Sequence, residues 1–312
     1  MPIAPTSESD FLPATWARAD AMAVGSQRAY YRTLASSLTL LLCAAALSAV
    51  HPAEIALQRL LSVGAALAFA LSLGLSLIAR SRQYDAAWFR ARSVAESIKS
   101  LAWKYACRAE PFAGEGNERE VDALFAKTLH GLADEIRGLP LLGAADRPEI
   151  SNAMRTVRAK TTESRRRVYV DGRLLNQRVW YDERAQEMEK KNARLFFTFI
   201  LINLIAACYA ILRAAYPAVF EFDALATLAA VSAAVIAWST SKRFGELSLA
   251  YAAALVDLGL AAEQFAPSLT DHELGLAVAD AESAISREHT RWAACGFRKF
   301  WRVNSGNSGQ LR

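Results

Sequence analysis

The chain has 312 residues, of which 53% are hydrophobic and 21% are charged, and its mean hydropathy is +0.13. That hydropathy is high for a purely soluble protein, and the formal net charge of +5 is too modest to favour nucleic acid as the main ligand. The four cysteines lie far apart without a CxxC pair, which argues against a disulfide framework or a metal site: Cys43, Cys107, Cys208 and Cys295.

Four blocks of 18 to 20 residues contain no charged residue: 33–50, 60–79, 195–212 and 224–241. A helix needs about 20 mostly apolar residues to cross the roughly 30 Å of hydrocarbon in a bilayer. The first block has the small residues of a signal peptide, but more than thirty residues precede it and a second block follows after a short loop. The sequence therefore predicts four membrane spans in two hairpins.

The basic residues predict the orientation of these spans. The loops 51–59 and 213–223 each carry one arginine, at the membrane edge, whereas the segment 80–194 is densely basic. Lys242 and Arg243 directly follow the fourth block. Because lysine and arginine accumulate on the cytoplasmic side, both termini and the large middle segment are expected to be cytoplasmic.

The two hairpins and the helices after them form an internal repeat. The offset from the first block to the start of the third equals the offset from the end of the second block to the end of the fourth. After the second block, mostly apolar residues recur at spacings of four and three: Tyr84, Trp88, Ala91, Ala95, Ile98, Ala102 and Tyr105. The pattern returns after the fourth block at one constant offset, with Ser248 as its weak point: Phe244, Ser248, Tyr251, Leu255, Leu258, Ala262 and Phe265. This period predicts a coiled-coil-like seam in each copy.

The segment after the second block is expected to be one long helix. Residues 80–109 contain no Pro or Gly, so they can continue as a helix out of the membrane. Its seam needs a partner, which could be the helix of the other repeat copy. Phe89 and Trp103 lie off the seam, which suggests either a second contact surface or burial at the membrane interface.

The predicted fold is an all-α membrane protein with two fused units. The first unit, 15–165, contains the first hairpin, the cytoplasmic helix 80–109 and a helical connector over 117–165. The second, 166–303, contains the second hairpin and cytoplasmic helices over 242–266 and 271–294. A capping box, Thr270 with Glu273, opens the last helix, and the polar tail 304–312 is expected to be disordered.

Two segments resemble a known family. YDAAWFRARSVAESIKSLAWKYACRAEPF, residues 84–112, resembles the post-membrane helix of SLATT domains (SMODS and SLOG-associating two-transmembrane effector domains). VDGRLLNQRVWYDERA, residues 170–185, resembles the entry helix of another SLATT subtype, which carries an Arg–Leu–x–x–Gln–x–x–Trp–Tyr–x–x–x–Ala pattern. The resemblance covers residues 15 to 300 as two units. The signature or packing residues that it implies are Tyr84, Trp88, Arg92, Glu96, Arg173, Gln177, Trp180 and Tyr181.

The resemblance implies a bacterial membrane effector of nucleotide-signalled or other conflict systems, one that permeabilises the membrane and stops or kills an infected cell. It also implies the bacterial inner membrane as the location, and a companion nucleotide-signalling or nucleotide-sensing protein as a partner. Two alternatives stay open: a membrane-anchored scaffold or sensor without pore activity, and a small transporter or channel with a housekeeping role.

No enzymatic motif stands beside this resemblance. The four histidines have no HxxxH or HExxH spacing, and no GxSxG, Walker or GxGxxG pattern occurs. The sequence therefore predicts no catalytic residue, no metal ligand and no cofactor.

The four blocks contain small polar residues in place of charged ones, and four of these residues are candidates for pore lining or helix packing: Ser36, Thr39, Ser76 and Asn203. Four spans packed about 8–10 Å apart leave no lumen between them. If the chain conducts, it is therefore expected to do so as a homo-oligomer in the lipid bilayer, with such polar side chains turned toward a shared axis.

Overall fold

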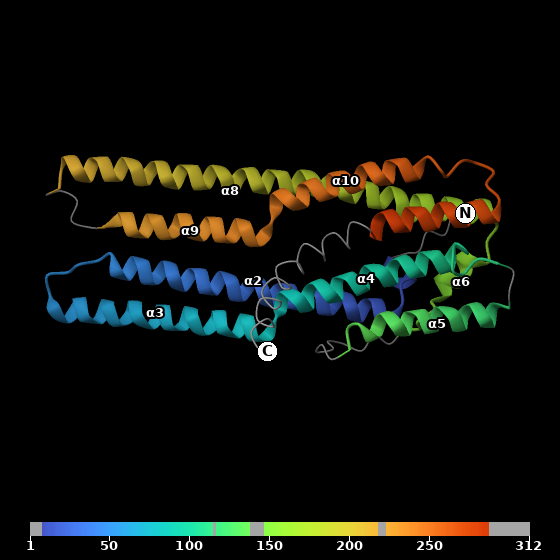
Figure 1. The fold of residues 1–312 in the computed structure, drawn as a ribbon, viewed down its shortest axis with the longest axis horizontal. Coiled ribbons are helices and arrows are strands. Elements are labelled where there is room, and N and C mark those ends of the chain that lie inside the picture. The colour runs from blue at the N-terminus through green and yellow to red at the C-terminus, as the bar shows by residue number, and fades with distance from the viewer. Residues whose placement is uncertain (1–7, 115–116, 138–146, 218–222, 287–312) are drawn as a thin grey trace, which may run out of the picture. The chain divides into compact units, whose positions relative to one another are not determined.

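The computed structural model describes residues 8–114, 117–137, 147–217 and 223–286, and every regular element within these ranges is a helix (Figure 1). The helices form two compact structural units, which are called the first and the second unit from here on. The first contains Met1–Gln27, Asp85–Arg184 and Ala250–Arg312, and the second contains Arg28–Tyr84 and Ala185–Leu249. Each unit therefore draws on both copies of the internal repeat.

The second unit consists of two helical hairpins. α2 (Ala14–Ser48) and α3 (Ile55–Arg82) form the first hairpin, and α8 (Leu175–Ala215) and α9 (Ala224–Lys242) form the second. α2 and α8 also extend into the first unit. Three of the four uncharged blocks lie wholly within these helices, and the first, 33–50, extends two residues past the end of α2.

Large apolar side chains cover the outside of the hairpins. Leu67, Phe197 and Ile211 are 59%, 67% and 70% exposed. The helices that carry the four blocks are long and apolar enough to cross a membrane. A helix that satisfies its own backbone and turns apolar side chains outward suits a lipid environment. The four predicted spans are confirmed.

Each hairpin ends at one residue in the left-handed conformation. Gln83 follows α3 with φ 48°, and Arg243 follows α9 with φ 52°. The next helix begins at once, as α4 (Tyr84–Ala106) in the first copy and α10 (Phe244–Ala262) in the second. Each break directly precedes the first seam residue of its copy, so the two breaks occupy the same position in the repeat.

The long helix expected over 80–109 is thus interrupted in the structure. The backbone N–H of Gln83 donates to the carbonyl oxygen of Ala79 at 3.2 Å, which closes the last turn of α3. Residue type does not signal this break, because glutamine rarely adopts a positive φ and no Gly or Pro is near. α10 is likewise shorter than the helix expected over 242–266.

The first unit is a helical bundle. It contains the N-terminal parts of α2 and α8, all of α4 but its first residue, most of α10, and these further elements: α1 (Glu8–Phe11), α5 (Glu118–Asp134), α6 (Asn152–Arg158), α7 (Thr162–Tyr169), a π-helical turn (Val170–Leu174) and a helix over 271–286. The Thr161 side chain caps α7, so the connector expected over 117–165 is divided into separate helices.

Aromatic rings fill the core of this bundle. The Trp103 ring lies 4.3 Å from Phe11 and 5.7 Å from Tyr169 between centroids. The Tyr105 ring lies 5.0 Å from Phe125. Such tilted and edge-to-face pairs are a favourable packing of large side chains. Trp103, off the predicted seam, therefore makes a second contact surface within the bundle.

The seam differs between the two copies. In α4 the seam residues from Trp88 to Tyr105 are all buried. In α10 only Leu258 of the seam is fully buried, at 1% exposed, and Ser248 donates to the carbonyl oxygen of Ala185 at 3.0 Å. The helix expected over 271–294 is described as far as residue 286, and residues 287–294 and 304–312 lie outside the described residues.

Candidate functional site

The signature residue Arg173 is the centre of a buried polar cluster in the first unit. Its Nε and Nη2 atoms donate to the Glu282 carboxylate at 3.0 and 3.1 Å, and its Nη1 donates to Gln177 Oε1 at 3.2 Å. The Tyr169 hydroxyl donates to the same carboxylate at 2.9 Å. Arg173 is 2% exposed and Glu282 is 0% exposed. Because a buried charge requires a partner, this pair ties the π-helical turn before α8 to the helix 271–286.

The other two signature residues of this copy lie on the same helix and pack against α10. The rings of Trp180 and Tyr181 lie 5.4 and 5.8 Å from the ring of Tyr251. The Arg184 guanidinium lies 5.8 Å from the Trp180 ring, within cation–π range. The structure thus places the four signature residues of the second copy in two packed clusters on one helix.

The signature residues of the first copy form a smaller cluster on α4. Arg92 donates to Asp20 of α2 at 3.1 Å and pairs with Glu96 at 2.5 Å. Trp88 is 6% exposed and stacks on Phe89 at 4.7 Å. Tyr84, the first residue of α4, belongs to the second unit, so it is not part of this cluster.

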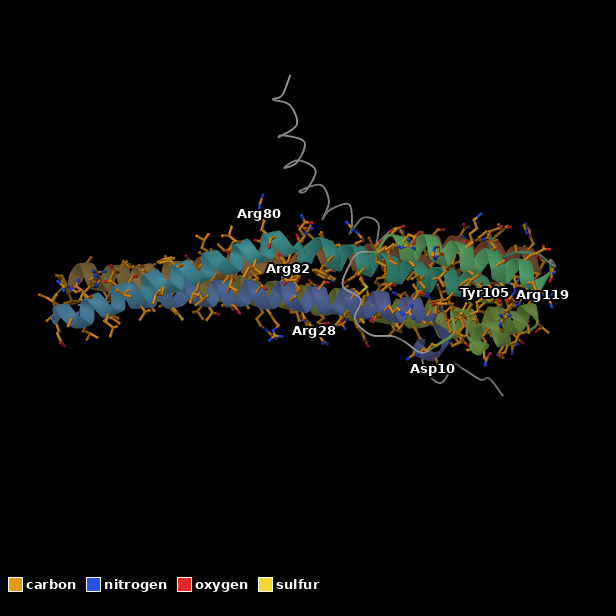
Figure 2. The ribbon with its side chains drawn as sticks, turned by 90° about the horizontal axis from the view of Figure 1, so that it is seen from below. Asp10, Arg28, Arg80, Arg82, Tyr105 and Arg119 are labelled. Carbon is orange, nitrogen blue, oxygen red and sulfur yellow. The ribbon has the colours of Figure 1, made fainter. Side chains whose placement is uncertain are left out.

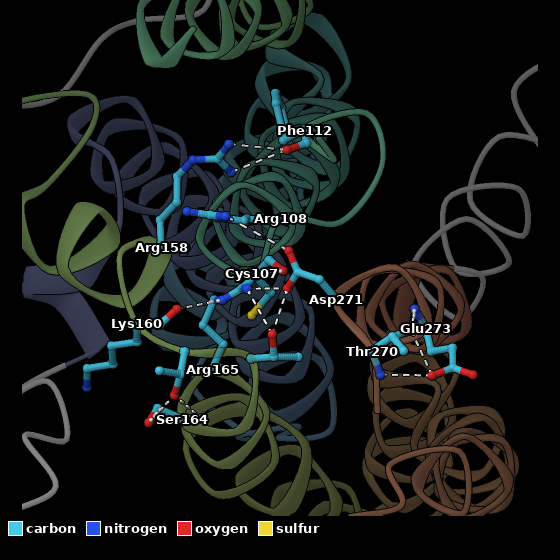
Figure 3. Close-up of polar contacts among 12 residues, drawn as sticks. Cys107, Arg108, Phe112, Arg158, Lys160, Ser164, Arg165, Thr270, Asp271 and Glu273 are labelled. Atoms are coloured by element: carbon cyan, nitrogen blue, oxygen red, sulfur yellow. Dashed lines mark hydrogen bonds and ion pairs between the residues drawn. The ribbon is translucent and has the colours of Figure 1, made fainter. Parts of the chain in front are cut away.

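Two buried arginines that the motifs do not include close the C-terminal end of α4 (Figure 3). Arg158 Nη1 donates to the Tyr105 carbonyl oxygen at 2.8 Å and to that of Phe112 at 3.3 Å. Arg165 Nη1 donates to the Cys107 carbonyl oxygen at 3.1 Å. They supply donors for carbonyl groups that the end of a helix leaves without partners. In the sequence both look like part of a basic surface, and no local signal marks them as buried.

The Asp271 carboxylate, at the start of the helix 271–286, contacts three side chains. Arg165 donates to its carboxylate, Thr162 Oγ1 donates to it at 3.1 Å, and Arg108 lies 3.9 Å away (Figure 3). The capping box before this helix is present as predicted. The Thr270 N–H donates to Glu273 Oε2 at 2.8 Å and the Glu273 N–H donates to Thr270 Oγ1 at 3.3 Å.

Burial raises the pKa values of two titratable groups in the first unit. It raises the pKa of the Cys107 thiol well above its ordinary value. It also raises the pKa of the Tyr169 hydroxyl, and the neighbouring Glu282 carboxylate adds to the effect. Both groups therefore stay neutral at physiological pH, and a buried neutral thiol is a poor nucleophile. Among the described residues, no group of three or more His, Cys, Asp or Glu side chains could hold a metal ion.

Hydroxyl groups join the two helices of the first hairpin. The Ser37 and Ser72 hydroxyls lie 2.8 Å apart, and Ser72 Oγ also lies 3.2 Å from the Ser37 carbonyl oxygen. Ser76 lies 3.4 Å from Ser37 and donates to the Ser72 carbonyl oxygen at 2.9 Å. Ser76, a candidate for lining or packing, thus contacts the packed cluster.

The second hairpin has one polar contact at the corresponding level. Asn203 Nδ2 donates to Ser232 Oγ at 2.9 Å and to the Phe199 carbonyl oxygen at 2.8 Å. Ser232 occupies the repeat position of Ser72, counted back from the break that ends each hairpin, so both hairpins use the same position of the second span. Asn203, although exposed, therefore contacts the facing helix of its hairpin.

The other two candidates face away from the packed helices. Ser36 and Thr39 are exposed on α2, and the Thr39 hydroxyl donates to the carbonyl oxygen of Ala35 within its own helix, at 2.9 Å. All four candidates are exposed, but Ser76 and Asn203 also reach a polar group on the facing helix of their hairpin, whereas the Thr39 hydroxyl bonds within its own helix.

Basic side chains surround the ends of the hairpins that precede the breaks. Arg28, Arg80 and Arg82 are exposed, and Figure 2 shows Arg28 and Arg80 extending away from the helices. Lys242 Nζ lies 3.2 Å from the centroid of the Tyr31 ring and 4.9 Å from that of Trp238. This cation–π contact joins the first hairpin to the second.

These elements define an all-α membrane protein that carries two transmembrane hairpins and a helical bundle built from both. The chain belongs to the SLATT family. Residues 13–166 match the SMODS and SLOG-associating 2TM effector domain 3, and residues 169–292 match the SMODS and SLOG-associating 2TM effector domain 1. The recognition of two fused SLATT units is confirmed. No curated protein and no solved structure matches the chain.

Proposed function

We propose that the chain is a bacterial inner-membrane effector of a conflict system that oligomerises and permeabilises the membrane when a cytoplasmic signal arrives. One observation carries this proposal: two effector domains of one family stand in tandem, and each contributes a hairpin whose spans contain no Asp, Glu, Lys, Arg or His. Transporters and proton relays usually place such groups within their spans. A conducting path formed between copies needs only small polar side chains, and Ser36 and Thr39 face outward.

The trigger is proposed to come from a companion protein. The family description names association with SMODS and SLOG, which supports a nucleotide-signalling or nucleotide-sensing partner. The first unit is the part of the chain that would receive the signal, because it carries the charged clusters around Arg92, Arg165 and Arg173.

The proposed orientation places both termini in the cytoplasm. Cysteines introduced by A53C and Y216C, in the two short loops, should react with an impermeant maleimide added to sealed cells, whereas one introduced by N117C should not. The native Cys43, Cys208 and Cys295 are first replaced by alanine. Labelling of the N117C variant from outside would overturn the orientation.

Flux measurements test permeabilisation itself. The full chain, reconstituted in vesicles filled with dyes of graded size, should release the smaller dyes, and its expression in bacteria should collapse the membrane potential. The S36L/T39L variant tests the role of the outward face. Bulky apolar groups there should reduce dye release without unfolding the hairpin. An assembled chain that releases no dye, with or without its companion, would favour the membrane-anchored scaffold.

A further inference from the structure

An uncharged stripe of exposed side chains runs along α10 in the first unit. Val256 and Leu260 are 64% and 63% exposed, and Ala252 and Ala253 are exposed one turn earlier. Spacings of three and four place these residues on one side of the helix. We call these four residues the α10 stripe. An apolar face of this kind is normally covered by another element.

The first repeat copy shows what the same helix side looks like when the chain itself covers it. Arg92, Glu96 and Ser100 of α4 occupy the repeat positions that Ala252, Val256 and Leu260 occupy in α10. Glu96 and Ser100 are 7% and 5% exposed. Arg92, whose side chain is 37% exposed, pairs with both Glu96 and Asp20 of α2, so this side of α4 carries polar groups that meet partners within the chain.

Burial and polarity are therefore reversed between the two copies. The corresponding sides of α4 and α10 are polar where the chain buries them and apolar where the chain leaves them exposed. Burial within one chain would favour the opposite assignment, because exposed apolar area is unfavourable in water. The reversal indicates that something outside the single chain covers the α10 stripe.

Gly259 gives a second indication at the same place. It lies within α10, three residues after Val256 and next to Leu260. A Cβ added at Gly259 would meet nothing within 4 Å. Glycine inside a helix is unfavourable relative to alanine, and no neighbour in the chain requires it here. A glycine beside an apolar stripe lets the backbone of another helix approach closely, as it does between membrane helices.

We propose that the α10 stripe is the surface on which two copies of the chain associate, with α10 of one copy against α10 of the second. The spacing of Ala253, Val256 and Leu260 is that of a helix seam, which fits a helical occupant. The stripe carries no charge, so it is complementary to itself and a second stripe meets no like-charge repulsion.

Membrane anchorage favours a second copy over a soluble occupant. α10 starts two residues after α9 ends, so every copy in the bilayer presents its stripe at the same distance along the chain from a membrane span. Confinement to one plane raises the effective concentration of stripes for one another. The inference rests on the oligomer of the proposed function and names its contact surface.

Disulfide trapping tests the contact in the full chain in vesicles. In a background with Cys43, Cys208 and Cys295 replaced by alanine, A253C places a thiol on the stripe and K127C places a thiol at another exposed position, on α5. Under mild oxidation the A253C variant should form covalent dimers at least about tenfold faster than the K127C variant, because paired residues share a high effective concentration.

Two further changes, made in the A253C variant, report on packing. V256D should slow dimer formation about tenfold, because it places a carboxylate in an apolar contact, whereas V256I should preserve the rate. G259A should also slow it, although the melting temperature of the chain should stay the same or rise, since alanine is the better helix former. A normal melting temperature for V256D shows that the fold is intact.

Two other occupants make distinct predictions. If lipid covers the stripe, a bimane label on the A253C variant will be quenched by brominated lipid and dimers will not form. If only a companion protein binds it, the A253C and K127C variants will crosslink equally slowly without quenching. Either result overturns the proposal.

Dye release from the same vesicles separates the two proposals: crosslinking without release overturns permeabilisation alone, and release without crosslinking overturns the α10 contact alone.

Discussion

Arg173 and Glu282 are charged side chains that the fold removes from water, and each is tolerated because the other lies opposite it at hydrogen-bonding distance. Tyr169 and Gln177 satisfy further donors and acceptors of the same cluster. Such a pair gives little net stability compared with apolar side chains, but removing one partner leaves an uncompensated charge. The cluster therefore specifies how the start of α8 meets the helix 271–286.

Changing Glu282 to glutamine should lower the free energy of unfolding of the first unit by about 3–5 kcal/mol, because Arg173 then stays buried without its counter-charge. The R173M/E282M double variant should recover much of this loss, since two apolar side chains need no ion pair. Tryptophan fluorescence during thermal unfolding in detergent measures both effects.

E163Q is the matched control for this prediction. Glu163 pairs with Arg166 and Arg167 at the surface, where solvent screens the charges, so the melting temperature should hardly change. If E282Q melted at the temperature of the E163Q variant, the buried pair would have no role in holding the bundle together.

At the scale of elements, the predictable features are the ones with a local period. The uncharged blocks identified the four spans, and the spacings of four and three placed the buried side of α4, including Ile98 at 0% exposed. The partner of Arg173 could not be predicted, because Glu282 lies 109 residues away and distant charges leave no pattern. The break at Gln83 could not be predicted either, since its residue type favours a continuing helix.

At the two left-handed breaks, substitution by glycine and substitution by valine should have different effects on stability. Q83G and R243G should leave the melting temperature unchanged or raise it, because glycine adopts φ near +50° without the roughly 1–2 kcal/mol that other residues spend. Q83V and R243V should lower the stability by about 1 kcal/mol or more, because a β-branched residue is strongly disfavoured there. Thermal unfolding of the reconstituted chain measures both.

Q58V provides the control for that series. Gln58 is an exposed residue near the start of α3, so the same change tests the helix propensity of valine without a positive φ. An equal loss in the Q58V and Q83V variants would show that the break has no special conformational requirement.

The polar contacts inside the hairpins should affect stability, whereas the outward-facing ones should affect flux. S72A and N203L should each destabilise their hairpin by about 0.6 kcal/mol, the average for a hydrogen bond between membrane helices. S36A and T39A remove no contact between helices, so stability should be unchanged. Unfolding in mixed micelles measures the first effect and dye release measures the second; destabilisation by S36A would place Ser36 in a packed contact.

At the scale of the whole molecule, the family boundary and the structural units do not coincide. The two SLATT matches divide the chain between residues 166 and 169, which is inside the first unit. Contacts cross this boundary within the unit: Trp103 lies against Tyr169, and Asp271 accepts from Arg165 and Thr162. The second unit likewise joins Tyr31 of one hairpin to Lys242 of the other. Each structural unit therefore contains residues of both SLATT domains, which contact one another.

This interleaving predicts the behaviour of a chain divided at the family boundary. Fragments 1–168 and 169–312 should each insert as a hairpin, because each holds two complete spans, but each should be degraded when expressed alone. Alone, the first fragment exposes Trp103 and the second exposes the ring of Tyr169 that packs against it.

Co-expressed, the fragments should copurify and melt cooperatively, since the same buried contacts re-form without the peptide bond. D271A, which removes the acceptor shared by Arg165 and Thr162, should weaken copurification more than E163Q, whose ion pairs stay within the fragment 1–168. Stable, separately folded fragments that ignore one another would show that the two domains are independent and that the contacts across residues 166–169 carry no stability.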